Sequence, residues 1–99
     1  MKVLYHTEVE RIISTLPKEY GSRVLKVIDL FEDYKFNLIQ AYLKKIARGI
    51  WELRGGRYRL LFGIIKGDTI IVNMFMKKTQ KTPKQAIDLA IKRLKEYEK

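Results

Sequence analysis

The sequence predicts a small α+β domain in the order strand, helix, helix, strand, strand, strand, helix. Three observations predict it: apolar residues recur at helical spacing between residues 7 and 34, the period changes to two after Gly49, and a helical stripe returns after Pro83. The chain has 99 residues, of which 46% are apolar, so we expect a single domain over residues 1–99. The three consecutive strands should form an antiparallel sheet, with the helices against one face.

The first third of the chain is predicted to form one strand and two helices. Residues 2–6 have the composition of a short strand, and Thr7 with Glu10 has the pattern of a capping box at a helix start. Pro17 separates this helix from a second one, expected over residues 18–34.

A β-hairpin is predicted after Gly49, where apolar and polar residues alternate. If Gly55-Gly56 forms a two-residue turn, Glu52 lies opposite Arg59 on one face. The other face then carries the apolar residues of both strands, Trp51, Leu53, Tyr58, Leu60 and Phe62. The preceding segment Phe36–Arg48 fits neither period, so a short helix and an extended connection both remain open.

A third strand, Ile70–Met76, follows a turn at Lys66–Thr69, and its register has two alternatives. A two-residue loop would place Met76 opposite Arg59 and align Lys78 with the basic face. A three-residue loop would instead align Asn73, Phe75 and Lys77 with that face.

A final helix is predicted after this strand. Thr82 is the expected N-cap, Pro83 the first helical residue and Gln85 the third residue after the cap. The expected buried stripe is Ile87, Ala90, Ile91, Leu94 and Tyr97.

The charge distribution predicts a polyanionic partner. The formal net charge is +10. Residues 1–43 carry six basic and six acidic side chains, whereas residues 44–99 carry 15 basic and five acidic ones. A charge excess confined to one half of the chain is more typical of a binding face than of a surface adapted for solubility.

Composition excludes several classes of site. The chain has no Cys and one His, which excludes a disulfide scaffold, a thiolate zinc site and a metal site with two imidazoles. We interpret His6 as a packed or solvated histidine, and Asp29, Glu32 and Asp33 as a solvated helix face rather than a magnesium site. No cofactor or metal is expected.

The sequence carries neither a signal peptide nor a membrane span that we can identify. Polar residues interrupt the first ten positions, and the apolar runs at 60–65 and 70–76 are far shorter than a membrane crossing. We therefore expect a cytoplasmic protein without a membrane partner.

Ten basic residues gather in two stretches that antiparallel strands would bring together, with Glu52 as the single acid among them. The basic residues are Lys44, Lys45, Arg48, Arg54, Arg57, Arg59, Lys77, Lys78, Lys81 and Lys84. Such a surface can follow a sugar–phosphate backbone. RNA also supplies its own nucleophile, the 2′-OH, so that cations and a base suffice for cleavage. The base is either a lysine or Glu52, and for Glu52 we favour an ion pair with Arg59.

Three motifs in the C-terminal half resemble a known family. Gly49–Arg54, Arg57–Phe62 and above all Phe75–Lys84 are similar to the HigB-like branch of the RelE toxin superfamily, which includes the phage-derived host-killing-like proteins. The resemblance spans most of the chain, and the family has the same strand-helix-helix-strand-strand-strand-helix order.

This resemblance implies an mRNA interferase of a type II toxin–antitoxin pair that cuts mRNA in the ribosomal A site without metal. The antitoxin partner of such a toxin is often a helix-turn-helix protein. By the same resemblance, Arg59 stabilises the reacting phosphate, Lys77 or Lys78 is the general acid, and Arg54 holds the RNA backbone.

The remaining basic residues and one aromatic residue are the expected RNA-binding set, with Phe75 stacking on a base. They are Lys44, Lys45, Arg48, Arg57, Phe75, Lys81 and Lys84. The alternative hypothesis is a non-catalytic module on the same fold that binds RNA or the ribosome. Cleavage would separate the two hypotheses, whereas binding would not.

Overall fold

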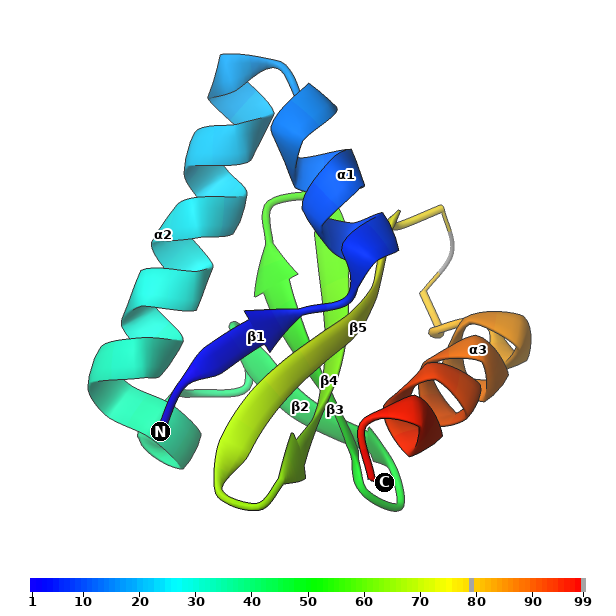
Figure 1. Ribbon diagram of the computed structural model, residues 1–99. Coiled ribbons are helices and arrows are strands. Elements are labelled where there is room, and N and C mark those ends of the chain that lie inside the picture. Colours follow the sequence, from blue (N-terminus) through cyan, green and yellow to red (C-terminus); the bar gives the residue numbers. More distant parts are fainter. Residues whose placement is uncertain (79, 99) are drawn as a thin grey trace.

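The computed structural model, which describes residues 1–78 and 80–98, contains one five-stranded sheet in the order β1-β5-β4-β3-β2 (Figure 1). The elements are β1 (Val3–Tyr5), α1 (Thr7–Thr15), α2 (Lys18–Tyr34), the 3₁₀ turn η1 (Lys35–Asn37), β2 (Leu43–Ala47), β3 (Ile50–Gly55), β4 (Tyr58–Ile65), β5 (Asp68–Met76) and α3 (Lys84–Glu96). The predicted α+β class is confirmed.

One feature of the sheet was left open by the sequence, and another differs from the prediction. The segment Phe36–Arg48, for which a short helix and an extended connection were both open, holds the short turn η1 and the edge strand β2. The alternation of apolar and polar residues typical of a strand is hard to recognise in β2, because Lys44 and Lys45 are both exposed and the register is irregular before Ala47. In addition, β1 pairs in parallel with β5, so the sheet is mixed rather than wholly antiparallel.

The helices cover both faces of the sheet, which corrects the expectation that all of them lie on one. α1 and α2 pack on the face that carries Leu53 and Phe62, while α3 packs on the opposite face, over Ile50 and Leu61 (Figure 1). The physical reason is that β4 and β5 carry buried apolar residues on both sides, to which Ile50 of β3 adds on the second side, so each side requires a cover. The apolar face predicted for the hairpin is the face under α2, as expected.

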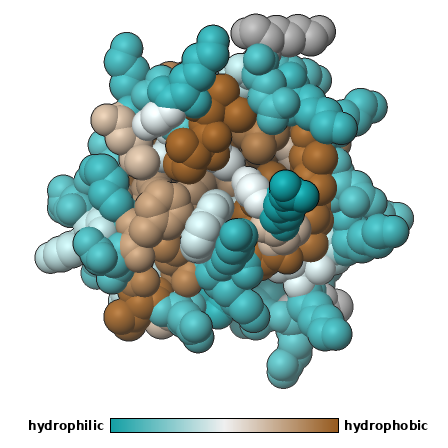
Figure 2. All heavy atoms as spheres, turned by 90° about the horizontal axis from the view of Figure 1, so that it is seen from below, coloured by the Kyte–Doolittle hydropathy of each residue, from teal (hydrophilic) through white to brown (hydrophobic). Residues whose placement is uncertain are grey.

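Hydrophobic side chains are not confined to the two cores. Figure 2 shows the molecule from below, at the end that carries the β4–β5 turn in Figure 1. Hydrophobic residues occupy the middle of this face and hydrophilic side chains surround them. The predicted catalytic residues of β3, β4 and the segment after β5 belong to the other end of these strands.

The β3–β4 turn consists of Gly56 and Arg57, one residue later than predicted. Gly56 has a φ of +63°, as the first central residue of a type II′ turn requires. Gly55 stays in the strand under α2, where an added Cβ would lie 3.1 Å from the Arg23 carbonyl oxygen. Glu52 consequently lies opposite Leu61 and not opposite Arg59. Because the register moves by two residues, every side chain keeps its predicted face.

The register of β4 and β5 combines both alternatives. Their turn has two residues, Lys66 and Gly67, both with positive φ. An irregularity between Leu61 and Phe62 then shifts the pairing by one residue. Arg59 therefore lies opposite Phe75, which is the alignment that the longer loop would have produced.

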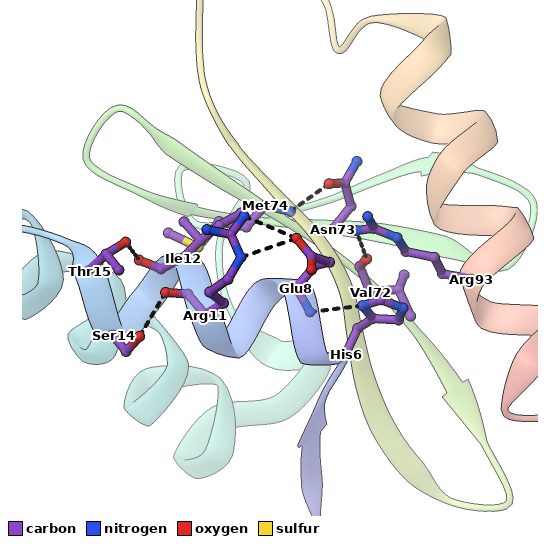
Figure 3. A network of polar contacts seen from close by, with 10 residues as sticks. All are labelled: His6, Glu8, Arg11, Ile12, Ser14, Thr15, Val72, Asn73, Met74 and Arg93. Carbon is purple, nitrogen blue, oxygen red and sulfur yellow. Dashed lines mark hydrogen bonds and ion pairs between the residues drawn. The ribbon is translucent and has the colours of Figure 1, made fainter.

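The N-cap of α1 is His6 and not Thr7, which is already helical. The Nδ1 atom of His6 accepts a hydrogen bond from the Glu8 backbone N–H at 3.1 Å (Figure 3). The other ring nitrogen lies 3.7 Å from the Glu96 carboxylate, near the C-terminal end of α3. His6 thus has a structural role, in agreement with the packed histidine expected from the sequence.

Helix α3 is also bound to the sheet by a side chain. The Arg93 guanidinium donates to the Val72 carbonyl at 3.0 Å (Figure 3).

Candidate nucleic-acid interface

A cavity of about 430 Å³ lies where β3 ends, β4 begins and β5 leads into α3. Among the described residues that line it, five are basic and one is acidic: Arg54, Arg59, Lys77, Lys78, Lys81 and Glu52. All four residues predicted to be catalytic belong to this group. The cavity therefore carries an excess of positive charge suited to a phosphate group.

The sheet register brings two of these side chains and one aromatic residue into one row. Arg54 lies opposite Arg59, and Arg59 lies opposite Phe75. All three side chains line the cavity. The predicted stacking residue Phe75 is therefore a direct neighbour of Arg59.

Glu52 forms part of the cavity wall although its residue is only 2% exposed. Its Oε2 atom lies 3.2 Å from the Nε atom of Arg54, and its Oε1 atom accepts a 2.6 Å hydrogen bond from the Thr82 hydroxyl. The expectation that Glu52 forms an ion pair is confirmed, but the partner is Arg54 rather than Arg59. With both oxygens engaged, Glu52 is poorly suited to act as a free base.

Arg59 is held by the backbone of the β3–β4 turn. Its Nη1 atom donates to the carbonyl oxygens of Gly56 at 2.9 Å and Tyr58 at 3.1 Å. Burial lowers the pKa of Arg59 below its ordinary value, the charge of Glu52 raises it, and that of Arg54 lowers it further. An arginine remains protonated under these influences. The cavity thus contains a fixed guanidinium whose environment favours an additional anion.

The segment between β5 and α3 supplies the lysines. The backbone N–H of Lys77 donates to the Arg57 carbonyl at 2.7 Å, which extends the β4–β5 pairing beyond the strands. Lys77, Lys78 and Lys81 are exposed along the cavity rim. Thr79, within the Phe75–Lys84 motif, lies outside the described residues.

The start of α3 differs from the prediction. Pro83 is the N-cap and Lys84 the first helical residue, whereas Thr82 was the expected cap. In the described part of the chain, no side chain donates or accepts a capping hydrogen bond there. The reason is that the Thr82 hydroxyl is bound to Glu52.

A second cavity of about 240 Å³ adjoins the first. It shares Glu52, Arg54, Lys81 and Thr82 with its neighbour and adds the two predicted RNA-binding residues of β2, Lys44 and Lys45. The Nζ atom of Lys45 also lies 5.5 Å from the centroid of the Trp51 ring, within the range of a cation–π contact.

Three predicted RNA-binding residues line neither cavity. Arg57 lies in the β3–β4 turn and Lys84 begins α3, so both are close in sequence to cavity residues. Arg48 lies in the β2–β3 turn, at the opposite end of β3 from Arg54. The structure thus groups most of the predicted site and leaves Arg48 apart from it.

Sequence reasoning missed the role of Thr82 in this site. Thr82 and Glu52 are 30 positions apart, and no local pattern links them.

The side chains of Asp29, Glu32 and Asp33 are exposed on α2. Within residues 1–78 and 80–98, no three His, Cys, Asp or Glu side chains are grouped so that they could hold a metal ion. None of the helices in those ranges is long and apolar enough to cross a membrane.

Comparison with known proteins gives a family and a fold. The sequence profile of the family described as "Phage derived protein Gp49-like" matches residues 11–95, which include every predicted site residue. No curated protein sequence matches the chain. A chain in the crystal structure of the archaeal RelE–RelB complex from Pyrococcus horikoshii OT3 is similar to this one, with a TM-score of 0.62 and 21% identity over 76% of this chain and 92% of that chain.

Proposed function

Because the chain belongs to the Gp49-like family of phage-derived proteins and has a RelE-like fold, we propose that it is the toxin of a type II toxin–antitoxin pair and cleaves mRNA. The match of family and fold confirms the resemblance to the RelE superfamily drawn from the sequence motifs. One observation carries the proposed activity: Arg54, Arg59, Lys77 and Lys78, which that resemblance assigns to catalysis, line one cavity.

The proposed reaction uses the 2′-OH of the RNA as the nucleophile. The 2′ oxygen bonds to the adjacent phosphorus, the bond from phosphorus to the 5′ oxygen breaks, and the products are a 2′,3′-cyclic phosphate and a 5′-hydroxyl. Arg59 stabilises the additional negative charge on the phosphorane, and Arg54 binds the RNA backbone. These roles require no metal ion.

Lysines of the cavity rim carry the two proton transfers in this proposal. Lys77 or Lys78 gives a proton to the leaving 5′ oxygen. The proton of the 2′-OH goes to a lysine amine in its neutral form, because both carboxylate oxygens of Glu52 are already engaged. Glu52 therefore anchors the site and does not act as the base.

The basic surroundings of the cavity support binding to RNA. Lys44, Lys45 and Lys81 line the adjoining cavity, and Arg57 and Lys84 are exposed and close in sequence to residues that line the first one. We propose that these residues bind mRNA or ribosomal RNA in the A site, that Arg48 adds a contact farther along the sheet, and that Phe75 stacks on a base. The implied partner that silences the toxin is an antitoxin, of the helix-turn-helix type if the protein is HigB-like, and the setting is cytoplasmic.

Mapping of RNA ends tests this proposal. A defined mRNA is incubated with the protein on programmed ribosomes and as naked RNA, the naked sample in EDTA, and the 5′ ends are mapped by primer extension. We expect cuts on ribosomes that disappear when the nucleotide on the 5′ side of the cut carries a 2′-deoxyribose, because that nucleotide supplies the attacking 2′-OH. Folded protein that binds ribosomes and produces no cut would contradict the proposal and favour the non-catalytic binding module.

A further inference from the structure

Glu52 connects the two parts of the candidate site, which come from different segments of the chain. One part is the β3–β4 hairpin, with Arg54 and Arg59, and the other is the segment after β5, with Lys77, Lys78 and Lys81. The carboxylate of Glu52 contacts Arg54 through one oxygen and Thr82, at the end of the lysine segment, through the other. A single side chain thus binds to both parts.

The burial of Glu52 indicates that these contacts are required. The residue is 2% exposed, and a carboxylate withdrawn from water is stable in its charged form only if it is paired and hydrogen-bonded. Arg54 supplies the opposite charge to Oε2 and Thr82 the hydrogen bond to Oε1. Removal of either partner leaves a buried oxygen without compensation.

Thr82 is not the N-cap of α3, although its local sequence favours that role; its hydroxyl instead binds Glu52. The sequence Thr82-Pro83-Lys84-Gln85 has the pattern of a helix N-cap followed by proline, yet Pro83 occupies the N-cap position. Where a strong local signal gives way to a contact distant in the sequence, a functional constraint is the usual cause.

The lysine segment is attached to the sheet at both of its ends. At its start, the Lys77 N–H donates to the Arg57 carbonyl at 2.7 Å. At its end, Thr82 donates to Glu52 at 2.6 Å. Just beyond, the side chain of Asn73 on β5 donates to the Ala86 carbonyl in the first turn of α3 at 3.1 Å. Of these three contacts, the Thr82–Glu52 bond is the one whose acceptor also forms an ion pair with Arg54.

We propose that Glu52 and Thr82 are positioning residues that hold the lysine segment at a fixed place relative to Arg54 and Arg59. This inference rests on the proposed function and deepens it. Cations stabilise a transition state most effectively when they are already oriented, and small displacements of such groups reduce the rate strongly. The contact between Glu52 and Thr82, which we call the tether, therefore acts on the chemical step more than on the affinity for RNA.

Two substitutions of Thr82 test the proposal on the full-length protein. Thr82→Val keeps the shape of the side chain and removes the hydroxyl, whereas Thr82→Ser keeps the hydroxyl. For Thr82→Val we expect kcat on programmed ribosomes to fall about tenfold or more while KM stays within about a factor of two. Thr82→Ser should recover most of the wild-type kcat. Thr15→Val, at an exposed position of α1, is the matched control and should leave both constants unchanged.

Amide hydrogen exchange provides a second readout that does not depend on activity. In Thr82→Val the amide of Lys77, which donates to the Arg57 carbonyl, should exchange faster than in wild type, while amides in the centre of β4 remain unchanged. If kcat and these exchange rates both match the wild type, the tether is refuted. A uniform drop in protection that is equally large in Thr82→Ser would also refute it, since that pattern is general destabilisation. If the wild type does not cleave RNA, the proposed function fails, and the exchange rates alone decide whether the tether exists.

Discussion

Arg54 on β3 and Arg59 on β4 lie directly opposite each other in the sheet, with both side chains at one cavity. Like charges at such positions destabilise an antiparallel pair. Glu52 offsets this repulsion, because it forms an ion pair with Arg54 and its charge also acts on Arg59. One buried carboxylate faces five basic residues of the described cavity lining, so the site favours a polyanion that supplies the remaining negative charge.

RNA binding should weaken steeply with salt, because phosphate contacts release counterions. In the variant with Lys77→Gln and Lys78→Gln, we expect the slope of log affinity against log salt to become shallower by roughly 0.7 for each phosphate that is no longer neutralised. The control is Lys26→Gln, at an exposed position of α2, which should retain the wild-type slope. Fluorescence anisotropy with a short single-stranded RNA measures the slope, and equal slopes in all three proteins would argue against phosphate binding by these lysines.

Gly55 should be intolerant of a side chain because β3 approaches α2 closely at this residue. An added Cβ would lie 3.1 Å from both the Arg23 carbonyl oxygen and the Val27 Cγ1 atom. We expect Gly55→Ala to lower the free energy of unfolding by about 1–3 kcal/mol. Gly21→Ala, in the interior of α2 with its nearest neighbour at 3.9 Å, should raise it by about 0.5–1 kcal/mol. Urea unfolding of the two variants measures the difference, and equal effects would show that the close approach has no energetic consequence.

Stability should decline at alkaline pH through Tyr5. Burial, together with the charges of Glu32 and Asp29, holds the pKa of Tyr5 above its usual 10.0. The folded protein therefore retains the phenolic proton more tightly than the unfolded chain. The resulting stability is fully present below pH 10.0 and is lost as the pH rises through the raised pKa. Tyr5→Phe should show a smaller decline than wild type in urea unfolding between about pH 9 and pH 11, and identical pH profiles would contradict this assignment.

The sequence was sufficient to predict those parts of the fold that depend on local periodicity. The two N-terminal helices separated by Pro17, the hairpin faces and the buried stripe of α3 all follow from spacing. The hairpin prediction even tolerated an error in the turn, since a shift of two residues preserves every face. The grouping of Arg54, Arg59, Lys77 and Lys78 likewise followed from the antiparallel order of the strands.

What the sequence did not predict depends on contacts between distant residues. The displacement of the β3–β4 turn arises from the packing of Gly55 under α2. The hydrogen bond from Thr82 to Glu52 joins residues that are 30 positions apart. The position of α3 required knowledge that the second face of the sheet, with Ile50 and Leu61, is also apolar and needs a cover. Such features are set by tertiary packing, and local propensity does not predict them.

In the proposed mechanism, Arg59 stabilises the transition state that forms when the RNA's own 2′-OH attacks the phosphate. The most direct test is the single-turnover cleavage rate on programmed ribosomes for Arg59→Ala, with Arg59→Lys and Arg11→Ala as comparisons. Arg11 lies on α1, where it pairs with Glu8. Thermal unfolding first establishes that Arg59→Ala is folded, because the wild-type side chain binds two carbonyls of the turn.

We expect the rate of Arg59→Ala to fall about 100-fold or more, that of Arg59→Lys to be intermediate, and that of Arg11→Ala to match the wild type. A folded Arg59→Ala protein that cleaves at a rate within about twofold of wild type would contradict the assignment of Arg59 and with it the proposed mechanism.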